Sequence, residues 1–65
     1  MQIDLNGAPV ATAAETLATL IDEHGFDAAS VATALDGVFV PRPLRSKTPL
    51  HRGAKVEVLS PMQGG

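Results

Sequence analysis

The chain has 65 residues, 45% of them hydrophobic, with no cysteine and a formal net charge of −2. A chain of this size forms one small domain, whose modest core leaves little room for a separate substrate domain or a deep cofactor pocket. The lack of cysteine excludes a disulfide framework, a zinc ribbon and a cysteine nucleophile. No apolar run approaches the roughly 20 residues that span a bilayer, and no basic and apolar leader opens the sequence. We therefore expect a soluble, cytoplasmic protein with no membrane partner.

Charge is distributed unevenly along the chain. All five Lys and Arg residues lie after position 36, whereas six of the seven acidic residues lie before position 37. Such asymmetry can mark a nucleic-acid surface. However, five cations neutralise few phosphates, and the basic half has only Phe39 as an aromatic residue. We expect no nucleic-acid partner and interpret the basic half as a protein-docking or merely solvated face.

The first two elements are expected to form a hairpin. Residues 2–5 alternate polar and apolar side chains, which predicts a half-buried strand. Asn6-Gly7 predicts a tight turn, because both turn positions favour positive φ, and residues 8–11 then form the return strand. Since Pro9 cannot donate a ladder hydrogen bond, this return strand is placed at a sheet edge.

An apolar stripe at helical spacing predicts the one helix of the chain. The stripe consists of Leu17, Leu20 and Ile21. Two signals compete for the start of the helix, because Thr12 begins a capping box and Thr16 can cap a shorter helix. We favour Thr16, since Leu17 is the first residue of the stripe. Gly25 is expected to end the helix.

The second half of the chain predicts three more strands. Residues 31–35 form a strand, Asp36-Gly37 a second tight turn, and residues 38–40 a short return strand. Prolines at positions 41 and 43 stop that return strand.

Residues 42–54 are expected to be irregular, with Leu44 and Leu50 as anchors into the core. Residues 55–59 alternate again and predict the last strand. The inward positions of all these elements define the expected core: Ile3, Leu5, Leu17, Leu20, Ile21, Leu35, Val56 and Val58.

This element order predicts an α+β domain in which a four- to five-stranded mixed sheet packs on one helix. The first and last strands suit the centre of the sheet, and the two strands marked by proline suit its edges. That arrangement is the β-grasp, or ubiquitin-like, architecture. We expect residues 1–60 to form the domain and residues 61–65 a flexible C-terminal tail.

No catalytic constellation is evident in the sequence. His24 among nearby carboxylates is a poor zinc site, because zinc prefers closed nitrogen and sulfur ligation. We expect His24 to interact favourably with the helix C-terminal dipole and His51, in a basic loop, to be exposed. We expect no bound metal.

The two final glycines are more informative than the histidines. Without a Cβ on Gly64 or Gly65, the tip of the chain can enter a narrow channel. The α-carboxylate can then serve as the substrate of another enzyme. The alternative is that the glycines simply end a disordered tail.

Motifs along the whole chain resemble the ThiS family, the small sulfur carrier proteins of thiamine biosynthesis. They are Leu35-Asp36-Gly37, Phe39-Val40-Pro41-Arg42, Thr48-Pro49-Leu50, Gly53 before Val56-Glu57-Val58, and Pro61-Met62-Gln63-Gly64-Gly65. Three positions depart from the usual pattern. Asp36 stands where the family usually has Asn, Arg45 where an aromatic residue is common, and Ala54 where Asp usually follows the glycine.

The resemblance implies a protein cosubstrate and not an enzyme. In the family, an adenylyltransferase related to ubiquitin-activating enzymes uses ATP and magnesium to convert the terminal carboxylate, here that of Gly65, into an acyl-adenylate. Sulfur from a cysteine desulfurase persulfide displaces AMP and leaves a thiocarboxylate, whose sulfur is accepted by thiazole synthase. ATP and magnesium belong to the activating enzyme, so the carrier itself is expected to bind no cofactor.

The resemblance also places recognition on the exposed sheet face and the tail. The residues expected to enter partner active sites are Met62, Gln63 and Gly64, and the candidates for partner docking are Phe39, Arg42 and Arg45. Three alternatives stay open: a sulfur carrier for molybdopterin synthesis, a ubiquitin-like modifier that is joined to lysines, and a β-grasp interaction module.

Overall fold

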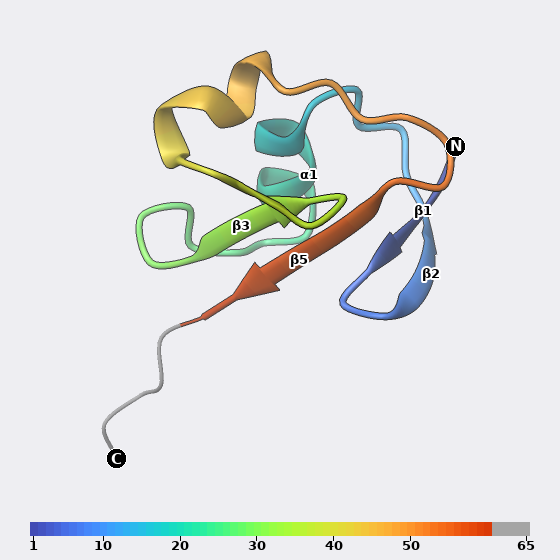
Figure 1. Cartoon of the computed structure of the whole chain (residues 1–65), viewed down its shortest axis with the longest axis horizontal. Coiled ribbons are helices and arrows are strands. Elements are labelled where there is room, and N and C mark those ends of the chain that lie inside the picture. Colours follow the sequence, from blue (N-terminus) through green and yellow to red (C-terminus); the bar gives the residue numbers. More distant parts are fainter. Residues whose placement is uncertain (61–65) are drawn as a thin grey trace.

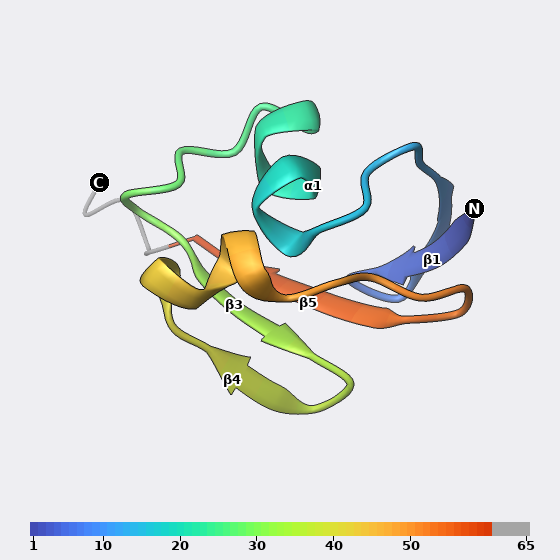
Figure 2. The ribbon, with the colours of Figure 1, turned by 90° about the horizontal axis from the view of Figure 1, so that it is seen from above.

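The structure, a computed structural model, describes residues 1–60. In these residues it contains β1 (Gln2–Leu5), β2 (Ala8–Ala11), α1 (Leu17–Glu23), β3 (Ala32–Leu35), β4 (Val38–Val40), the 3₁₀ helix η1 (Arg42–Lys47) and β5 (Lys55–Leu59). The strands form one sheet, and α1 covers one of its faces (Figures 1 and 2). The predicted α+β β-grasp fold is confirmed, with five strands in the described part. The expected tail, residues 61–65, lies outside it.

The strand order is β2-β1-β5-β3-β4. The central pair, β1 and β5, is parallel, and the other three pairs are antiparallel, so the sheet is mixed as predicted. The edge strands are β2, which contains Pro9, and β4, which Pro41 follows. This order confirms both edge predictions. A proline suits an edge strand because its nitrogen has no hydrogen to donate to a second neighbouring strand.

Both predicted hairpin turns are present and have the same backbone requirement. Asn6 has φ 52° and Asp36 has φ 51°, and the glycine after each also has positive φ. Asn and Asp tolerate this left-handed conformation better than other residues with a side chain. Asp36 therefore retains the turn chemistry expected of the usual Asn.

Thr16, the favoured N-cap, is the cap observed for α1. Its Oγ1 accepts a hydrogen bond from the backbone N–H of Thr19 at 3.2 Å. Thr12, the alternative cap, lies outside the helix and donates its hydroxyl hydrogen bond to Glu23 at 2.5 Å, which ties the segment before α1 to its last turn. Gly25 follows the helix with φ 72°, as expected of a terminating glycine.

The core lies between α1 and the sheet. Its buried hydrophobic residues are Ile3, Ala14, Leu17, Leu20, Ile21, Val40, Leu50, Ala54, Val56 and Val58. Leu5 and Leu35 were expected in this set but are only partly buried and pack against it. Leu50 is an anchor as predicted, being 8% exposed. Ala54 is fully buried, so an Asp carboxylate at this position would be removed from water at a cost in free energy.

The expectation that residues 42–54 are irregular and anchored by Leu44 is wrong in part. Residues 42–47 form η1, and the Leu44 side chain is 49% exposed. A 3₁₀ helix has three residues per turn, so a short one turns only a single residue in each turn toward the core. In η1 the buried residue is Arg45.

Candidate functional site

The candidate site begins where β5 ends. The predicted reactive residue, Gly65, and the predicted channel-entering residues Met62, Gln63 and Gly64 lie outside the described residues. The structure does place the base from which they follow. Leu59 ends β5 at the far end of the sheet from Met1, and Ser60 is the last described residue (Figure 1). The central strand β5 thus leads directly to the candidate reactive segment.

An apolar patch lies on the sheet face opposite α1, beside the end of β5. We call Ala32, Ala34, Phe39 and Leu59 the outer patch; with Glu57 they line a shallow hollow. The strand register sets them side by side, since Ala34 pairs with both Phe39 and Glu57, and Ala32 pairs with Leu59. Phe39 and Leu59 are each 65% exposed. Clustered exposed apolar side chains on a small domain are typical of protein-contact surfaces.

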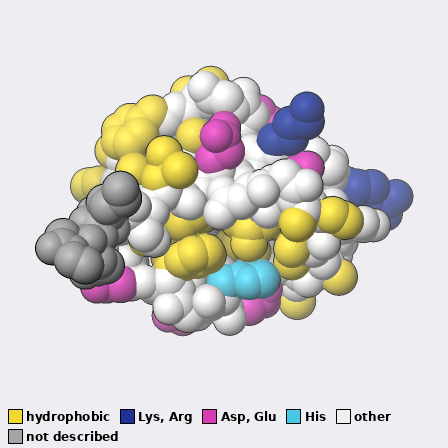
Figure 3. Space-filling model, turned by 90° about the horizontal axis from the view of Figure 1, so that it is seen from below, with side chains coloured by type: hydrophobic (Ala, Val, Ile, Leu, Met, Phe, Trp, Pro, Cys, Tyr) yellow, Lys and Arg dark blue, Asp and Glu magenta, His cyan; other side chains and the backbone are white. Residues whose placement is uncertain are grey.

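Figure 3 shows hydrophobic side chains spread over the underside of the molecule, with carboxylates between them and Lys and Arg side chains toward one end.

Leu59 was not among the predicted site residues, although the sequence carries a signal for it. Lys55 and Glu57 are the outward positions of β5, and the alternation makes Leu59 the next outward position.

The predicted docking residues differ in their availability. Phe39 is exposed in the outer patch, and Arg42 is exposed at the start of η1. Arg45, by contrast, is only 4% exposed, so its prediction as a docking residue is wrong. The reason is that its guanidinium turns inward and donates to the protein's own oxygen atoms.

Arg45 joins three segments of the fold. Its Nε donates to Thr33 Oγ1 at 2.9 Å, its Nη1 to the Ala28 carbonyl at 2.9 Å, and its Nη2 to the Val31 carbonyl at 2.6 Å. Thr33 in turn donates its hydroxyl to the Val40 carbonyl at 2.8 Å. Burial, and then the charge of the nearby Arg42, lower the pKa of Arg45. The network fixes the segment before β3 against η1.

Arg45→Met is expected to lower the free energy of unfolding by about 1–3 kcal/mol, because the Ala28 and Val31 carbonyls lose their donors. Arg45→Lys should recover little of this loss, since an ammonium lacks the planar fork that reaches three acceptors. Chemical denaturation measures both changes. The matched control is Arg42→Met at an exposed position, expected to change stability by less than about 0.5 kcal/mol. Equal effects at positions 42 and 45 would contradict this role for Arg45.

A second network joins the β3–β4 turn to the loop before β5. His51 is exposed, as predicted, and its Nε2 lies 2.6 Å from Asp36 Oδ2 while its Nδ1 lies 3.0 Å from the Arg52 carbonyl. Both partners are acceptors, so the two contacts are both hydrogen bonds only when the imidazole is protonated. These contacts, that to Asp36 first, raise the pKa of His51. Hydrogen bonds from the Lys55 N–H and from His51 lower the pKa of Asp36.

This pair predicts a pH-dependent contribution to stability. The contribution of His51 is complete below its unfolded pKa of about 6.5 and is lost as the pH rises through its raised folded pKa. That of Asp36 is present above its unfolded pKa of about 3.9 and is lost as the pH falls through its lowered folded pKa. His51→Gln should therefore lower the melting temperature most near about pH 5–6 and least in alkaline solution. A His51→Gln effect independent of pH would refute the charged pair.

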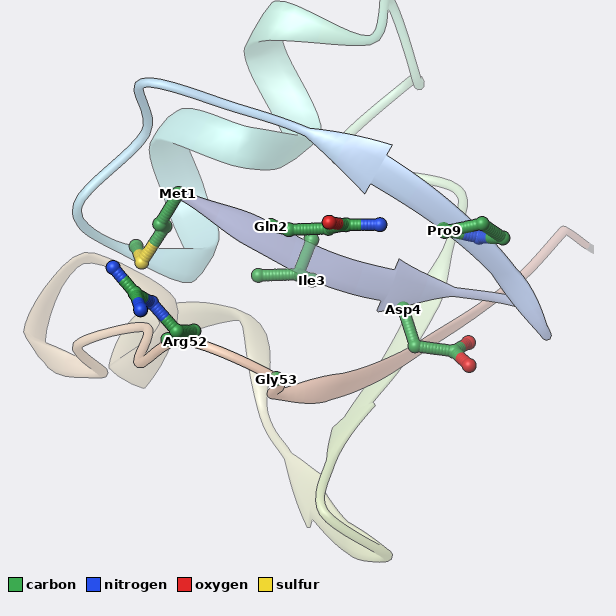
Figure 4. A pocket seen from close by; sticks show the side chains of 7 residues that line it. All are labelled: Met1, Gln2, Ile3, Asp4, Pro9, Arg52 and Gly53. Atoms are coloured by element: carbon green, nitrogen blue, oxygen red, sulfur yellow. The ribbon is translucent and has the colours of Figure 1, made fainter.

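A separate hollow of about 560 Å³ lies near the N-terminus. It is lined by Met1, Gln2, Ile3, Asp4, Pro9, Arg52 and Gly53. Figure 4 shows Arg52 beside Met1 at one end of this hollow and Asp4 with Pro9 toward the other. The hollow adjoins the beginning of β5, whereas the candidate reactive segment follows the end of β5. It is therefore not part of the candidate site.

His24 lies at the end of α1, where its Nε2 is 3.8 Å from Glu23 Oε1. Its backbone N–H also caps the helix by donating to the Leu20 carbonyl at 3.1 Å. Residues 1–60 bring together no group of three or more histidine, aspartate or glutamate side chains that could hold a metal ion. The observed contacts of His24 stabilise the last turn of α1.

A match over nearly the whole chain decides the family. A sequence profile of the ThiS family matches residues 3–65, which include the final Gly64-Gly65. The chain belongs to the ThiS family. No curated protein matches its sequence significantly.

The solved structures similar to this ThiS-family chain include two from one organism. One is the crystal structure of a thiamine biosynthesis protein, ThiS, from Geobacter metallireducens, with a TM-score of 0.83, 29% identity and complete coverage of both chains. The other is the NMR solution structure of a thiamine biosynthesis protein from the same organism. It has a TM-score of 0.83 and 26% identity, covering 100% of this chain and 88% of that one.

Proposed function

We propose that this ThiS-family chain is a sulfur carrier of thiamine biosynthesis. Its Gly65 carboxylate is adenylated and converted to a thiocarboxylate that donates sulfur to thiazole synthase. The observation that carries the proposal is the family match over residues 3–65, because it runs through the two final glycines. The similarity over the full length of this chain to a crystal and an NMR structure of one thiamine biosynthesis protein target supports the same role.

The chemistry explains why the carrier needs a partner enzyme. A carboxylate is a poor electrophile, so one of its oxygens first attacks the α-phosphorus of ATP, and pyrophosphate leaves. The resulting acyl-adenylate has AMP as a good leaving group, and the outer sulfur of a cysteine desulfurase persulfide displaces it to give an acyl disulfide. A thiol then attacks the desulfurase sulfur of this acyl disulfide, is itself oxidised to a disulfide, and releases the thiocarboxylate. An adenylyltransferase related to ubiquitin-activating enzymes holds the ATP and magnesium. This chain supplies the carboxylate and acts as a cosubstrate, not as an enzyme.

The body of the domain supplies recognition. Docking on the outer patch removes Phe39 and Leu59 from water, which favours association by burial of apolar area. Arg42 is exposed and can pair with acidic groups of a partner. Glycines at positions 64 and 65 leave the carboxylate without a side chain beside it, so it can enter a narrow active site. Met62 and Gln63 would follow it into the channel. The protein would act in the cytoplasm.

Reconstitution with an adenylyltransferase of this type tests the proposal. With ATP and magnesium, mass spectrometry should detect an acyl-adenylate on Gly65. Phe39→Ala should raise KM for the carrier and leave kcat and the melting temperature nearly unchanged, because Phe39 is mostly exposed in the free domain. Absence of the adenylate with an active enzyme would contradict the proposed function. An unchanged KM would remove Phe39 from the docking surface.

A further inference from the structure

The last residues of β5 determine where the reactive segment leaves the domain. On one side they are held by β3, where Thr33 pairs with Val58 and Ala32 pairs with Leu59. On the other side β1 pairs with β5 at only two positions, through Asp4 with Lys55 and Leu5 with Val56. β1 then ends, whereas β5 continues for three more residues. The end of β5 therefore has no strand beside it on this side.

The Asn6 side chain takes the place of the missing strand. Just past β1, the Asn6 backbone N–H donates to the Val56 carbonyl at 2.9 Å. Its side-chain Oδ1 accepts from the Val58 N–H at 2.8 Å, and its Nδ2 donates to the Val58 carbonyl at 3.2 Å. One side-chain amide thus makes both hydrogen bonds that a neighbouring strand would make with Val58.

The turn alone does not require asparagine at this position. The Asn6 φ of 52° is equally open to glycine and tolerated by aspartate. Asp36, the matching residue of the second hairpin, shows the difference. It pairs with the start of β5, using its backbone N–H for the Lys55 carbonyl and its Oδ1 for the Lys55 N–H. At Val58 the side chain must both donate and accept, which an amide does and a carboxylate does not.

We propose that Asn6 is a positioning residue for sulfur transfer: its side-chain amide fixes Val58 and thereby the direction in which the reactive segment leaves the sheet. The inference rests on the proposed function, since it assigns Asn6 a role in presenting the Gly65 carboxylate. Only three positions, 59 to 61, separate Val58 from the Met62-Gln63-Gly64-Gly65 end. Misplacement of a reacting group by about 1 Å can cost roughly a hundredfold in rate.

Two substitutions separate the side-chain hydrogen bonds of Asn6 to Val58 from the role of Asn6 in the turn. Asn6→Gly keeps the positive φ but removes both side-chain hydrogen bonds. Asn6→Asp keeps the acceptor for the Val58 N–H and sets a second oxygen against the Val58 carbonyl. Amide hydrogen exchange at Val58 and Leu59 should become about tenfold faster in Asn6→Gly, with a smaller change at Val56. The adenylation kcat/KM of Asn6→Gly should fall about tenfold, and that of Asn6→Asp should fall less.

Thr16→Ala is the matched control, because it removes the cap of α1 without touching β5. If Thr16→Ala lowers the melting temperature as much as Asn6→Gly does, it should still be adenylated at the normal rate and show normal hydrogen exchange at Val58. Unchanged amide hydrogen exchange at Val58 in Asn6→Gly would show that the Asn6 side chain does not hold Val58. Faster exchange with an unchanged kcat/KM would show that Asn6 holds Val58 but has no positioning role. If the wild type itself is not adenylated, the proposed function is wrong. The exchange result then decides alone whether Asn6 holds the end of β5.

Discussion

Deleting Gly64 and Gly65 is expected to abolish adenylation while leaving the melting temperature nearly unchanged. Neither glycine has a side chain, so deleting them removes no apolar side-chain contact from the fold. Activity depends on the reach of the carboxylate, because a reacting group displaced by two residues no longer meets the nucleotide. A melting curve and a mass-spectrometric adenylation assay on the same sample measure the two effects.

Two further variants at the same end sharpen this test. Extra residues after Gly65 should be as damaging as deletion, since the α-carboxylate becomes an amide. Gly64→Val should reduce adenylation less than deletion but still severely, because a β-branched side chain restricts the backbone and widens the chain. Near-normal adenylation of a variant that ends at Gln63 would show that the reacting carboxylate is not that of Gly65.

Leu20→Ala is expected to lower the free energy of unfolding by about 2–5 kcal/mol. Leu20 is fully buried at the centre of the α1 stripe, between Leu17 and Ile21. Removing its isobutyl group leaves a cavity that a core of this size fills poorly. The total stability of a small domain is only about 5–15 kcal/mol, so the variant loses a large part of it. Denaturant unfolding gives the value directly.

Asp22→Ala is the control for Leu20, because Asp22 is an exposed position on the same helix. A surface change of this kind should alter stability by less than about 0.5 kcal/mol. A loss below about 1 kcal/mol for Leu20→Ala would mean that the α1 stripe does not face the core.

The fold could be predicted from local signals because they agree with one another. The Asn6-Gly7 and Asp36-Gly37 turns fix two hairpins, and Pro9 fixes an edge. The helix start at Thr16 follows from the first apolar residue of the stripe. These features depend on residues that are neighbours in the sequence, which is why a single sequence reveals them.

The features that escaped prediction depend on contacts between distant residues. Arg45 reaches acceptors 12 to 17 positions away, and no periodicity in the sequence predicts a buried cation. Its place at a position where the ThiS family often has an aromatic residue was the available signal. Asn6 and Val58 are 52 positions apart, so the turn motif showed only one of the two roles of Asn6.

The candidate site likewise contains one residue that the sequence predicted and one that it did not. Phe39 was predicted and lies in the outer patch, whereas Leu59 completes that patch through its register with Ala32. Register between strands that are far apart in sequence is set by the whole sheet, so the sequence alone did not bring these two residues together.

The central claim, that this chain carries sulfur on Gly65, is tested most directly by the intact mass of the protein purified from cells that make thiamine. Fragmentation should locate a single oxygen-for-sulfur exchange at the Gly65 carboxylate, and incubation with thiazole synthase and its substrates should restore the carboxylate. A chain that carries no sulfur at Gly65 under these conditions, or one recovered as conjugates joined to lysines of other proteins, would contradict the account.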